Sequence, residues 1–223
     1  MPPSRDPREA VCLVCRRLYD RGLIAGSDGN VSVRLDAGRL LVTPAGLPKS
    51  DLAPEDLVEI TPDGVHVAGS GRASSEIRVH LRLYRLRPDV GAVVHAHPPT
   101  ATAFAVAGED FMSPVLPELI FHMGLVPLVP YATPGTEALA ALFEPLAAGH
   151  DAFLMASHGA TTVGPTVEVA HQRMESLEHA ARILLAARQV GRVNTLADAE
   201  VRALTEARRV AAQAPPPPPA PGG

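Results

Sequence analysis

The sequence predicts an α/β fold organised as one large domain. Some segments repeat apolar residues with the period of a helix, and others alternate apolar and polar residues with the period of a strand. At 223 residues, 46% of them apolar, the chain is long enough to bury a sizeable core. We expect this domain to span residues 1–213. The remaining segment at 214–223, APPPPPAPGG, should be a disordered or polyproline II extension, because proline donates no ladder hydrogen bonds.

The first half of the domain should begin with a helix and continue into hairpins. Asp6 and Pro7 form a helix start and Gly22 a stop, which predicts a helix over 7–21. The period then falls to two, as in a half-buried strand. The elements expected next are a hairpin of 31–35 with 40–43, a strand at 57–60, a hairpin-like connection, a helix at 74–86 capped by Ser74 or Ser75, and a strand at 91–95.

The second half should contain further helices and a buried pair of strands. Expected helices cover 100–107, 116–123 and 135–147, a long helix opened by Pro165, and a last helix at 196–213. Expected strands are 125–129, 152–157 and 160–163. The apolar stripe predicted for the long helix consists of Ala170, Met174, Leu177, Ala181, Leu184 and Leu185.

Composition excludes several classes of function. The net charge is −4 and the arginines are scattered, so nucleic acid is not an expected partner. No run approaches the roughly 18 apolar residues that span a bilayer, and the start MPPSRDPREA lacks a hydrophobic signal region, so we expect no membrane association and a cytoplasmic protein. Cys12 and Cys15, inside the first helix, should be core residues rather than metal ligands.

Lys49 is the only lysine, and its surroundings argue against Schiff-base chemistry. A reactive amine needs burial or a neighbouring cation to lower its pKa. The segment GLPKSD around Lys49 is predicted to be a polar turn. Such a turn should neither bury the amine nor place another cation beside it.

Three histidines follow two buried strands. His95 and His97 in GAVVHAHPPT are two residues apart, so both side chains can share one face of a strand. His158 comes directly after the buried run AFLMAS. Three nitrogen ligands with an open fourth position are typical of a catalytic zinc site. The chain has nine histidines, so this spacing alone favours a metal site and an accidental grouping about equally. His66, His80, His150, His171 and His179 are expected to be solvated or satisfied in the core.

Glu76 and three short loops have anion-binding or catalytic character. Ser74-Ser75-Glu76 opens a predicted helix, where free backbone amides favour an anion. SDGN at 27–30 and TPAG at 43–46 are turns that let a ligand approach the backbone. Taken singly, each is more often a helix cap or an ordinary turn. No phosphate-loop or dinucleotide fingerprint occurs.

In this order and spacing, these motifs resemble the class II aldolase and adducin family. The set comprises Gly29-Asn30, TPAG at 43–46, Ser74-Ser75-Glu76, HAH at 95–97 and SHGA at 157–160, and YATPGT at 131–136 looks like the connecting segment of the family. The resemblance covers about residues 8–190. Within the family it is strongest to the L-fuculose-1-phosphate aldolases and related small phosphoketose aldolases.

The resemblance implies a three-layer α/β/α fold with a mostly antiparallel central sheet, and a homotetramer with the active site near a subunit interface. His95, His97 and His158 would hold Zn²⁺, or another divalent ion such as Mn²⁺ or Co²⁺, one per subunit. Glu76 would be the fourth ligand and the proton-transfer base. The residues implied to cradle the substrate phosphate are Gly29, Asn30, Ala45, Gly46, Ser74 and Ser75.

The implied activity is that of a zinc-dependent aldolase, a carbon–carbon lyase of carbohydrate metabolism. It would reversibly cleave a small ketose-1-phosphate, such as L-fuculose-1-phosphate or a 5-deoxypentulose-1-phosphate, into dihydroxyacetone phosphate and an aldehyde. The divalent ion would stabilise the charge that develops on the substrate oxygens.

Three positions depart from the family pattern, and three other functions compete. Ala45 replaces a hydroxyl residue that is common in the family, and Asp28 adds a negative charge beside the phosphate loop. Segment 112–129 lacks the tyrosine that protonates the leaving aldehyde in the family, and Glu118 or His122 could substitute for it.

The first competing function is that of a methylthioribulose-1-phosphate dehydratase, which would keep the fold and the metal. A non-catalytic adducin-like module would not need all four proposed ligands, and a zinc hydrolase is disfavoured because the metallo-β-lactamase motif is missing.

Overall fold

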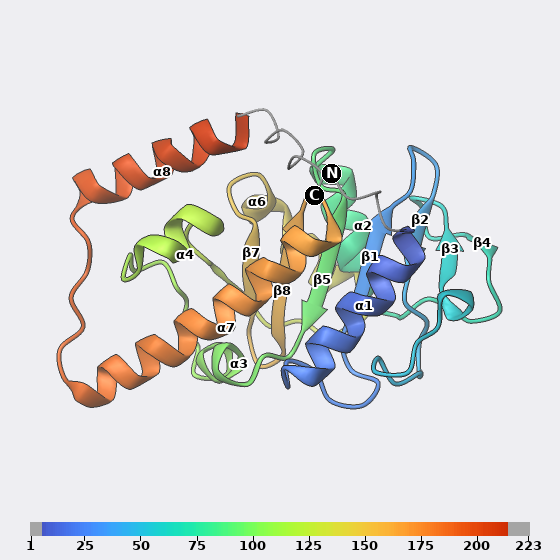
Figure 1. The fold of residues 1–223 in the computed structure, drawn as a ribbon, viewed down its shortest axis with the longest axis horizontal. Helices are drawn as coiled ribbons and strands as arrows, with labels where there is room; N and C mark the ends of the chain where they lie inside the picture. Colours follow the sequence, from blue (N-terminus) through green and yellow to red (C-terminus); the bar gives the residue numbers. More distant parts are fainter. Residues whose placement is uncertain (1–5, 214–223) are drawn as a thin grey trace, which may run out of the picture.

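An eight-stranded sheet forms the centre of the protein in a computed structural model, which describes residues 6–213 (Figure 1). Its strand order is β4-β3-β2-β1-β5-β8-β7-β6. All neighbouring strands are antiparallel except β6 and β7, so the predicted mostly antiparallel sheet is confirmed. The strands are β1 (Asn30–Arg34), β2 (Leu40–Val42), β3 (Val58–Ile60), β4 (His66–Ala68), β5 (Ala92–Ala96), β6 (Leu128–Val129), β7 (Ala152–Met155) and β8 (Gly159–Gly164).

Helices cover both faces of the sheet, as the predicted three-layer fold requires. Helices α1 (Pro7–Asp20), α3 (Pro99–Val106) and α7 (Val167–Val190) lie on the face toward the viewer in Figure 1. Helices α2 (Ile77–Leu86), α5 (Glu137–Ala141) and α6 (Glu144–Ala147) cover the other face, and α4 (Pro117–His122) and α8 (Asp198–Gln213) pack together at one side. A 3-10 turn, η1 (Pro54–Asp56), precedes β3. Within residues 6–213, no helix is both long and apolar enough to cross a membrane.

The two faces of the sheet belong to two separate hydrophobic cores. Along β5, Ala92 and Val94 pack with α1 and α7, whereas Val93 packs with α2. This alternation follows from the two-residue period of a strand. Because both faces are covered, β5 is buried along its whole length and has no polar residue before His95.

Most predicted elements are confirmed within a few residues, and three differ for local reasons. The helix expected over 135–147 is two short helices, because Pro145 has no N–H to continue the first one. The strand expected at 125–129 is only two residues long, between Pro127 and Pro130. Helix α2 begins at Ile77, so Ser74, Ser75 and Glu76 lie in the turn before it rather than in its first turn. In α7, Leu185 is 43% exposed and leaves the predicted apolar stripe.

Lys49 is buried, and the prediction that nothing buries it is wrong. Its residue is 2% exposed, and burial lowers the pKa of the amine. The Nζ atom donates to the backbone carbonyls of Ser27 and Leu47 at 3.0 Å each, with Pro44 at 3.5 Å. The ammonium therefore joins two loops, and its protons are committed to carbonyl oxygens rather than free for Schiff-base chemistry. The two cysteines are packing residues as predicted, with Cys15 fully buried and its pKa raised to about 12 by burial.

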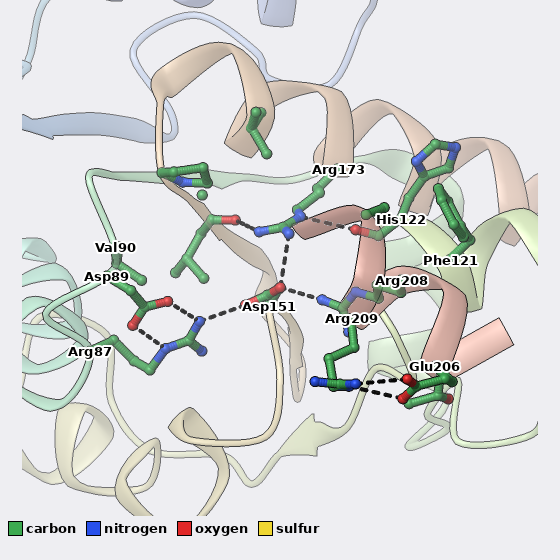
Figure 2. Close-up of a pocket in the computed structure, with 16 residues that line it drawn as sticks. Arg87, Asp89, Val90, Phe121, His122, Asp151, Arg173, Glu206, Arg208 and Arg209 are labelled. Carbon is green, nitrogen blue, oxygen red and sulfur yellow. Dashed lines mark hydrogen bonds and ion pairs between the residues drawn. The ribbon is translucent and has the colours of Figure 1, made fainter. Parts of the chain in front are cut away.

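Three arginines from three elements converge on Asp151, beside a cavity of about 680 Å³ (Figure 2). Arg87 from the end of α2 and Arg173 from α7 each lie 2.9 Å from the carboxylate, and Arg208 from α8 also pairs with it. None of residues 198–211 of α8 is fully buried, so the ion pair of Arg208 with Asp151 is a main attachment of α8 to the rest of the domain. Arg87 also pairs with Asp89, at 2.7 Å.

Asp151→Asn should lower the free energy of unfolding by about 3 kcal/mol, because it removes the one carboxylate shared by three partly buried guanidinium groups. Asp89→Asn is the matched control: its side chain is 64% exposed, and its loss should cost less than about 1 kcal/mol. Urea unfolding of the two variants measures the difference. Similar losses for both would show that Asp151 does not organise this corner of the fold.

A buried polar network connects β1 with α2. Ser32 Oγ lies 2.7 Å from His80 Nδ1 and 2.9 Å from the Tyr84 hydroxyl. Burial lowers the pKa of His80 to about 4 and raises the pKa of Tyr84 above its usual range, so both rings are neutral at pH 7. The structure thus places His80 in the core, one of the two environments expected for it.

His80 should make the protein less stable in acid. Its pKa of about 4 in the folded protein lies below the usual 6.5, so between these values the unfolded chain binds a proton that the folded chain does not. Stability should therefore fall as the pH is lowered from 6.5 toward 4, by up to about 1.4 kcal/mol per pH unit for this group. Urea unfolding of His80→Gln should show a shallower pH dependence than the wild type. Equal slopes would contradict the prediction.

Candidate metal centre

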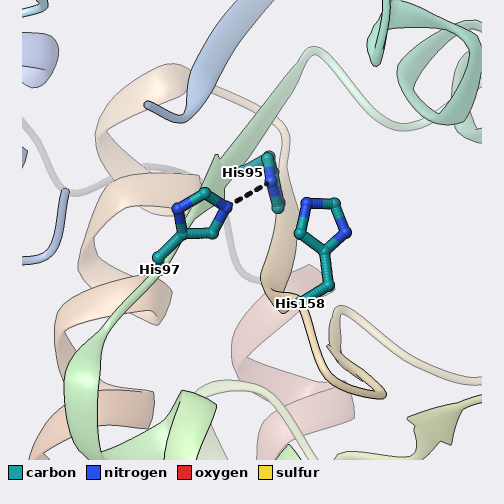
Figure 3. Close-up of side chains that lie close together, drawn as sticks. All are labelled: His95, His97 and His158. Atoms are coloured by element: carbon teal, nitrogen blue, oxygen red, sulfur yellow. Dashed lines mark hydrogen bonds between the residues drawn. The ribbon is translucent and has the colours of Figure 1, made fainter. Parts of the chain in front are cut away.

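His95 and His97 lie at the C-terminal end of β5, in the middle of the sheet. His95 still pairs with Asn30 of β1 on one side and Thr161 of β8 on the other. His97 follows the strand, and its backbone N–H donates to the Leu23 carbonyl at 2.9 Å. Because the two side chains are two residues apart, they point the same way, and their ring centroids lie 5.0 Å apart (Figure 3).

His158 reaches the same point from the turn between β7 and β8. Ser157 before it has a left-handed backbone with φ 55°, which residues other than glycine seldom adopt. Gly159 after it leaves room for His97, since a Cβ there would lie 2.5 Å from the His97 ring. The His158 ring centroid is 4.8 Å from that of His95 and 5.3 Å from that of His97. This tight turn brings the third predicted histidine onto the other two.

The His95 nitrogen that faces the other two histidines carries a lone pair. His95 Nδ1 lies 2.9 Å from the Ala160 carbonyl oxygen, which can only accept, so Nδ1 carries the proton and Nε2 does not. That Nε2 is 3.2 Å from His97 Nε2. Burial lowers the pKa of His95 to about 3 and also lowers the pKa of His97, so both rings are neutral near pH 7. Neutral imidazole is the form that ligates a metal.

Glu76 faces the histidines from the turn before α2. One carboxylate oxygen lies 2.9 Å from His158 Nε2, and the other lies 3.4 Å from His95 Nε2 and accepts from Asn30 Nδ2 at 2.9 Å. Burial alone would raise the pKa of Glu76, but the hydrogen bond with His158 and the electrostatic influence of the histidines lower it to about 2. Glu76 is therefore a carboxylate anion with a side chain only 18% exposed.

These four side chains fit a divalent cation. One nitrogen from each of the three histidines lies within 4.8 Å of the others. Within residues 6–213, His158 Nδ1 is buried without a hydrogen-bond partner. Buried ring nitrogens that converge beside an anion are costly alone and are stabilised by a cation between them. Three histidines are also the protein ligand number that leaves one position for a carboxylate or a substrate.

The residues expected to cradle a phosphate lie on three loops next to Glu76. An isolated bridge between Pro44 and Ala73 holds the TPAG loop against the Ser74-Ser75 turn, and Asn30 binds Glu76 directly. Gly29 lies against β5, where a Cβ would be 2.8 Å from the His95 carbonyl oxygen.

The polar groups of these loops differ in how free they are to bind a ligand. The Ala45 amide donates to the Arg72 carbonyl at 2.8 Å, so it is already used. Gly46 has a left-handed backbone, φ 77°, and open space around its Cα. Ser74 Oγ accepts from the Glu76 amide at 3.4 Å. The Ser75 side chain lies against Gly135 of the YATPGT segment, where a Cβ would be 3.0 Å from Ser75 Oγ.

Asp28 is a neighbour of the site whose position was not predicted. Its carboxylate lies 3.7 Å from His97 Nδ1, the ring nitrogen that points away from the other histidines. The sequence predicts only a negative charge beside the phosphate loop, and in the structure this charge faces His97. The position follows from the pairing of Asn30 with His95, and no local pattern in the sequence specifies that register.

Glu118 and His122, the suggested substitutes for the missing tyrosine, lie on α4. Both are exposed, and His122 lines the cavity beside Asp151. Within the described chain, no hydrogen bond or ion pair joins either residue to the histidine cluster.

Comparisons with known proteins agree with this geometry. A profile of the class II aldolase and adducin N-terminal domain matches residues 9–185. The 3-oxo-tetronate 4-phosphate decarboxylase of Escherichia coli O6:H1 is 37% identical over 181 residues, which cover 79% of this chain and 85% of that protein. The 5-methylthioribulose-1-phosphate/5-deoxyribulose-1-phosphate aldolase of Rhodospirillum rubrum is 35% identical over 213 residues, covering 94% and 92%.

A solved structure agrees as well. The structure of an L-fuculose 1-phosphate aldolase superposes on this chain with a TM-score of 0.86 and is 28% identical in sequence. The superposition covers 92% of this chain and 97% of the aldolase chain. The profile match and the relatives above 30% identity confirm the resemblance drawn from the sequence: the chain belongs to the class II aldolase and adducin family.

Proposed function

We propose that the protein is a metal-dependent carbon–carbon lyase that acts on a small phosphorylated ketose. The observation that carries this proposal is the ionised Glu76 carboxylate held against three histidines, 2.9 Å from His158. A cation site with a carboxylate at its edge combines the two elements that such a cleavage needs, a Lewis acid and a group that moves a proton.

His95, His97 and His158 would hold one Zn²⁺ per chain, with Mn²⁺ or Co²⁺ as alternatives, and Glu76 would be the fourth ligand in the absence of substrate. When bound, the ion polarises the substrate carbonyl and stabilises the negative charge that develops on its oxygen. Class II aldolases are metal-dependent enzymes, and the four donor groups match a catalytic zinc site.

Glu76 would move the proton on carbon. In a ketose-1-phosphate the C3–C4 bond breaks, the C4 hydroxyl becomes the aldehyde and releases its proton, and the electron pair stays on C3 as an enediolate with C2. The Glu76 carboxylate would take up the released proton and return it to C3, which yields dihydroxyacetone phosphate. Asn30 orients the carboxylate for this step through its 2.9 Å hydrogen bond.

The substrate phosphate would bind at the loops that adjoin Glu76, with Gly29, Asn30, Ala45, Gly46, Ser74 and Ser75 around it. Gly46 and Ser74 are the best placed of these, because the Ala45 amide is committed to Arg72 and the Asn30 amide group to Glu76. Lys49 would stabilise the loops of this phosphate site, because its Nζ donates hydrogen bonds to the carbonyls of Ser27 and Leu47.

For the substrate we propose L-fuculose-1-phosphate or a 5-deoxypentulose-1-phosphate, supported by the similarity to the R. rubrum aldolase. A second candidate is decarboxylation of 3-oxo-tetronate 4-phosphate, the reaction named for the E. coli relative at 37% identity. Loss of CO₂ leaves the same enediolate and needs no acid to protonate a leaving aldehyde. That chemistry suits segment 112–129, which has no tyrosine.

We also propose a homotetramer, with the active site near a subunit interface. The support is the family itself, and light scattering at several protein concentrations tests the assembly.

The metal-loaded protein should release dihydroxyacetone phosphate from at least one of three substrates: L-fuculose-1-phosphate, 5-deoxyribulose-1-phosphate and 3-oxo-tetronate 4-phosphate. Aldehyde formed together with it identifies an aldolase, and CO₂ identifies a decarboxylase. A chelator should abolish the activity and added Zn²⁺ restore it. Turnover that survives complete metal removal would overturn the mechanism, and water loss without dihydroxyacetone phosphate would indicate a dehydratase.

Glu76→Gln should retain the fold and a bound metal but lose about 10²–10⁴-fold in kcat, because the amide cannot transfer a proton. Glu175→Gln is the matched control, since Glu175 also faces a histidine, His171, but on α7 and outside the site. Steady-state kinetics and metal analysis measure both effects. A Glu76→Gln enzyme with wild-type kcat would remove Glu76 from the proton-transfer role.

A further inference from the structure

His97 is held less firmly by its own strand than His95 is. The last residue of β5 that pairs with β8 is Ala96, opposite Ala160, so His97 lies just beyond the ladder. Its side chain is 27% exposed, against 3% for His95, and its Nδ1 lies 3.7 Å from the Asp28 carboxylate, beyond hydrogen-bond distance. The His95 ring, in contrast, is fixed by the Ala160 carbonyl. The position of His97 therefore depends on the backbone on either side of it.

The backbone after His97 has few hydrogen-bond donors. Pro98 and Pro99 follow it, and proline has no N–H. Helix α3 begins at Pro99, so the first amides after His97 are those of Thr100 and Ala101, in the first turn of the helix. Amides in a first turn have no partner within their own helix, and Pro98 at the cap position has no polar side chain that could accept from them.

Glu178 of α7, the helix that packs along α3, binds both of these amides (Figure 1). Its Oε2 accepts from the amides of Thr100 and Ala101 at 2.9 Å each, and its Oε1 lies 3.2 Å from the Thr100 amide. Arg182, one turn further along α7, donates to Oε1 at 2.8 Å. The residue Glu178 is 3% exposed. A carboxylate at a helix N-terminus is favourable because it satisfies free amides and faces the positive end of the helix dipole.

The backbone before His97 is fixed in the same region. The Leu23 carbonyl accepts from the His97 N–H at 2.9 Å. Leu23 and Glu178 both line one small cavity of about 110 Å³. Two contacts from distant parts of the chain therefore hold the segment around His97, one from the loop after α1 and one from α7.

We propose that Glu178 is a positioning residue of the metal centre, which holds His97 in place by anchoring the start of α3 to α7. Glu178 acts through the backbone and touches neither the ion nor the substrate. Because α3 follows His97 after a single residue, a displacement of Thr100 and Ala101 would move His97 as well. This inference rests on the proposed metal centre and not on the identity of the substrate.

Three substitutions separate the hydrogen bonds of Glu178 from its charge. Glu178→Gln keeps an oxygen that can accept from both amides, Glu178→Asp keeps the charge on a side chain one methylene shorter, and Glu178→Ala removes both features. The affinity for Zn²⁺ should fall about 10–100-fold in Glu178→Ala, as is typical for residues that orient a metal ligand. Glu178→Asp should lose a smaller part of the affinity, and Glu178→Gln should keep most of it.

Two controls separate this effect from a general loss of stability. Asp151→Asn weakens the fold far from α3, and Glu175→Ala removes a carboxylate of α7 that faces Arg21 and His171 instead of α3. Both should bind Zn²⁺ as the wild type does. Competition with a chromophoric chelator, at a temperature where every variant is folded, measures the dissociation constants. The visible spectrum of the Co²⁺-loaded protein, which reports ligand geometry, should change in Glu178→Ala and stay unchanged in both controls.

Wild-type Zn²⁺ affinity in Glu178→Ala, or an equal loss in Asp151→Asn, would overturn the positioning role. A tighter site in Glu178→Asp than in Glu178→Gln would overturn it too, because the charge and not the hydrogen bonds would then act on the centre. If Glu178→Ala does not fold, the order of these two variants decides. A wild type that binds Zn²⁺ but cleaves none of the three substrates would contradict the proposed reaction alone, whereas a wild type that binds no divalent ion would overturn both proposals.

Discussion

The antiparallel pairing of β5 with β1 and β8 is the constraint on which the rest of the site depends. Asn30, His95 and Thr161 lie side by side across three strands because of the register of these two pairings. The same register carries the loop with Asp28 and Gly29 to one side of the histidines and the His158 turn to the other. A shift by one residue would turn His95 into the opposite core, so the apolar residues of β5 also hold the site in place.

Charge and burial are balanced within the site in a way that suits a cation. The imidazoles of His95 and His97 are kept neutral, and one carboxylate is kept ionised although burial opposes it. Outside the cluster, Asn30 and the Ala160 carbonyl fix the orientation of Glu76 and His95. The Asp151 cluster is the reverse case, because there the positive and negative charges satisfy one another and the carboxylate ties elements together.

An aldol cleavage and a decarboxylation make similar demands on such a site. Each leaves an electron pair on the carbon next to a ketone, and each ends when that carbon is protonated. The reactions differ only in the group that leaves, so the residues around the leaving group decide between them. This explains how relatives with different reactions share the same fold.

The sequence by itself determined the fold class and the family, and it predicted that the three histidines lie together with Glu76, because period, spacing and motif order are local properties of the chain. Tertiary structure alone decided the burial of Lys49, the place of Asp28 beside His97 and the contacts of His80 and Tyr84 with Ser32. Each of these depends on contacts between segments far apart in the chain, such as β1 with β5 or the 27–30 turn with the 44–49 loop. Side-chain patterns reveal which face of an element is buried, but only packing reveals what lies against it.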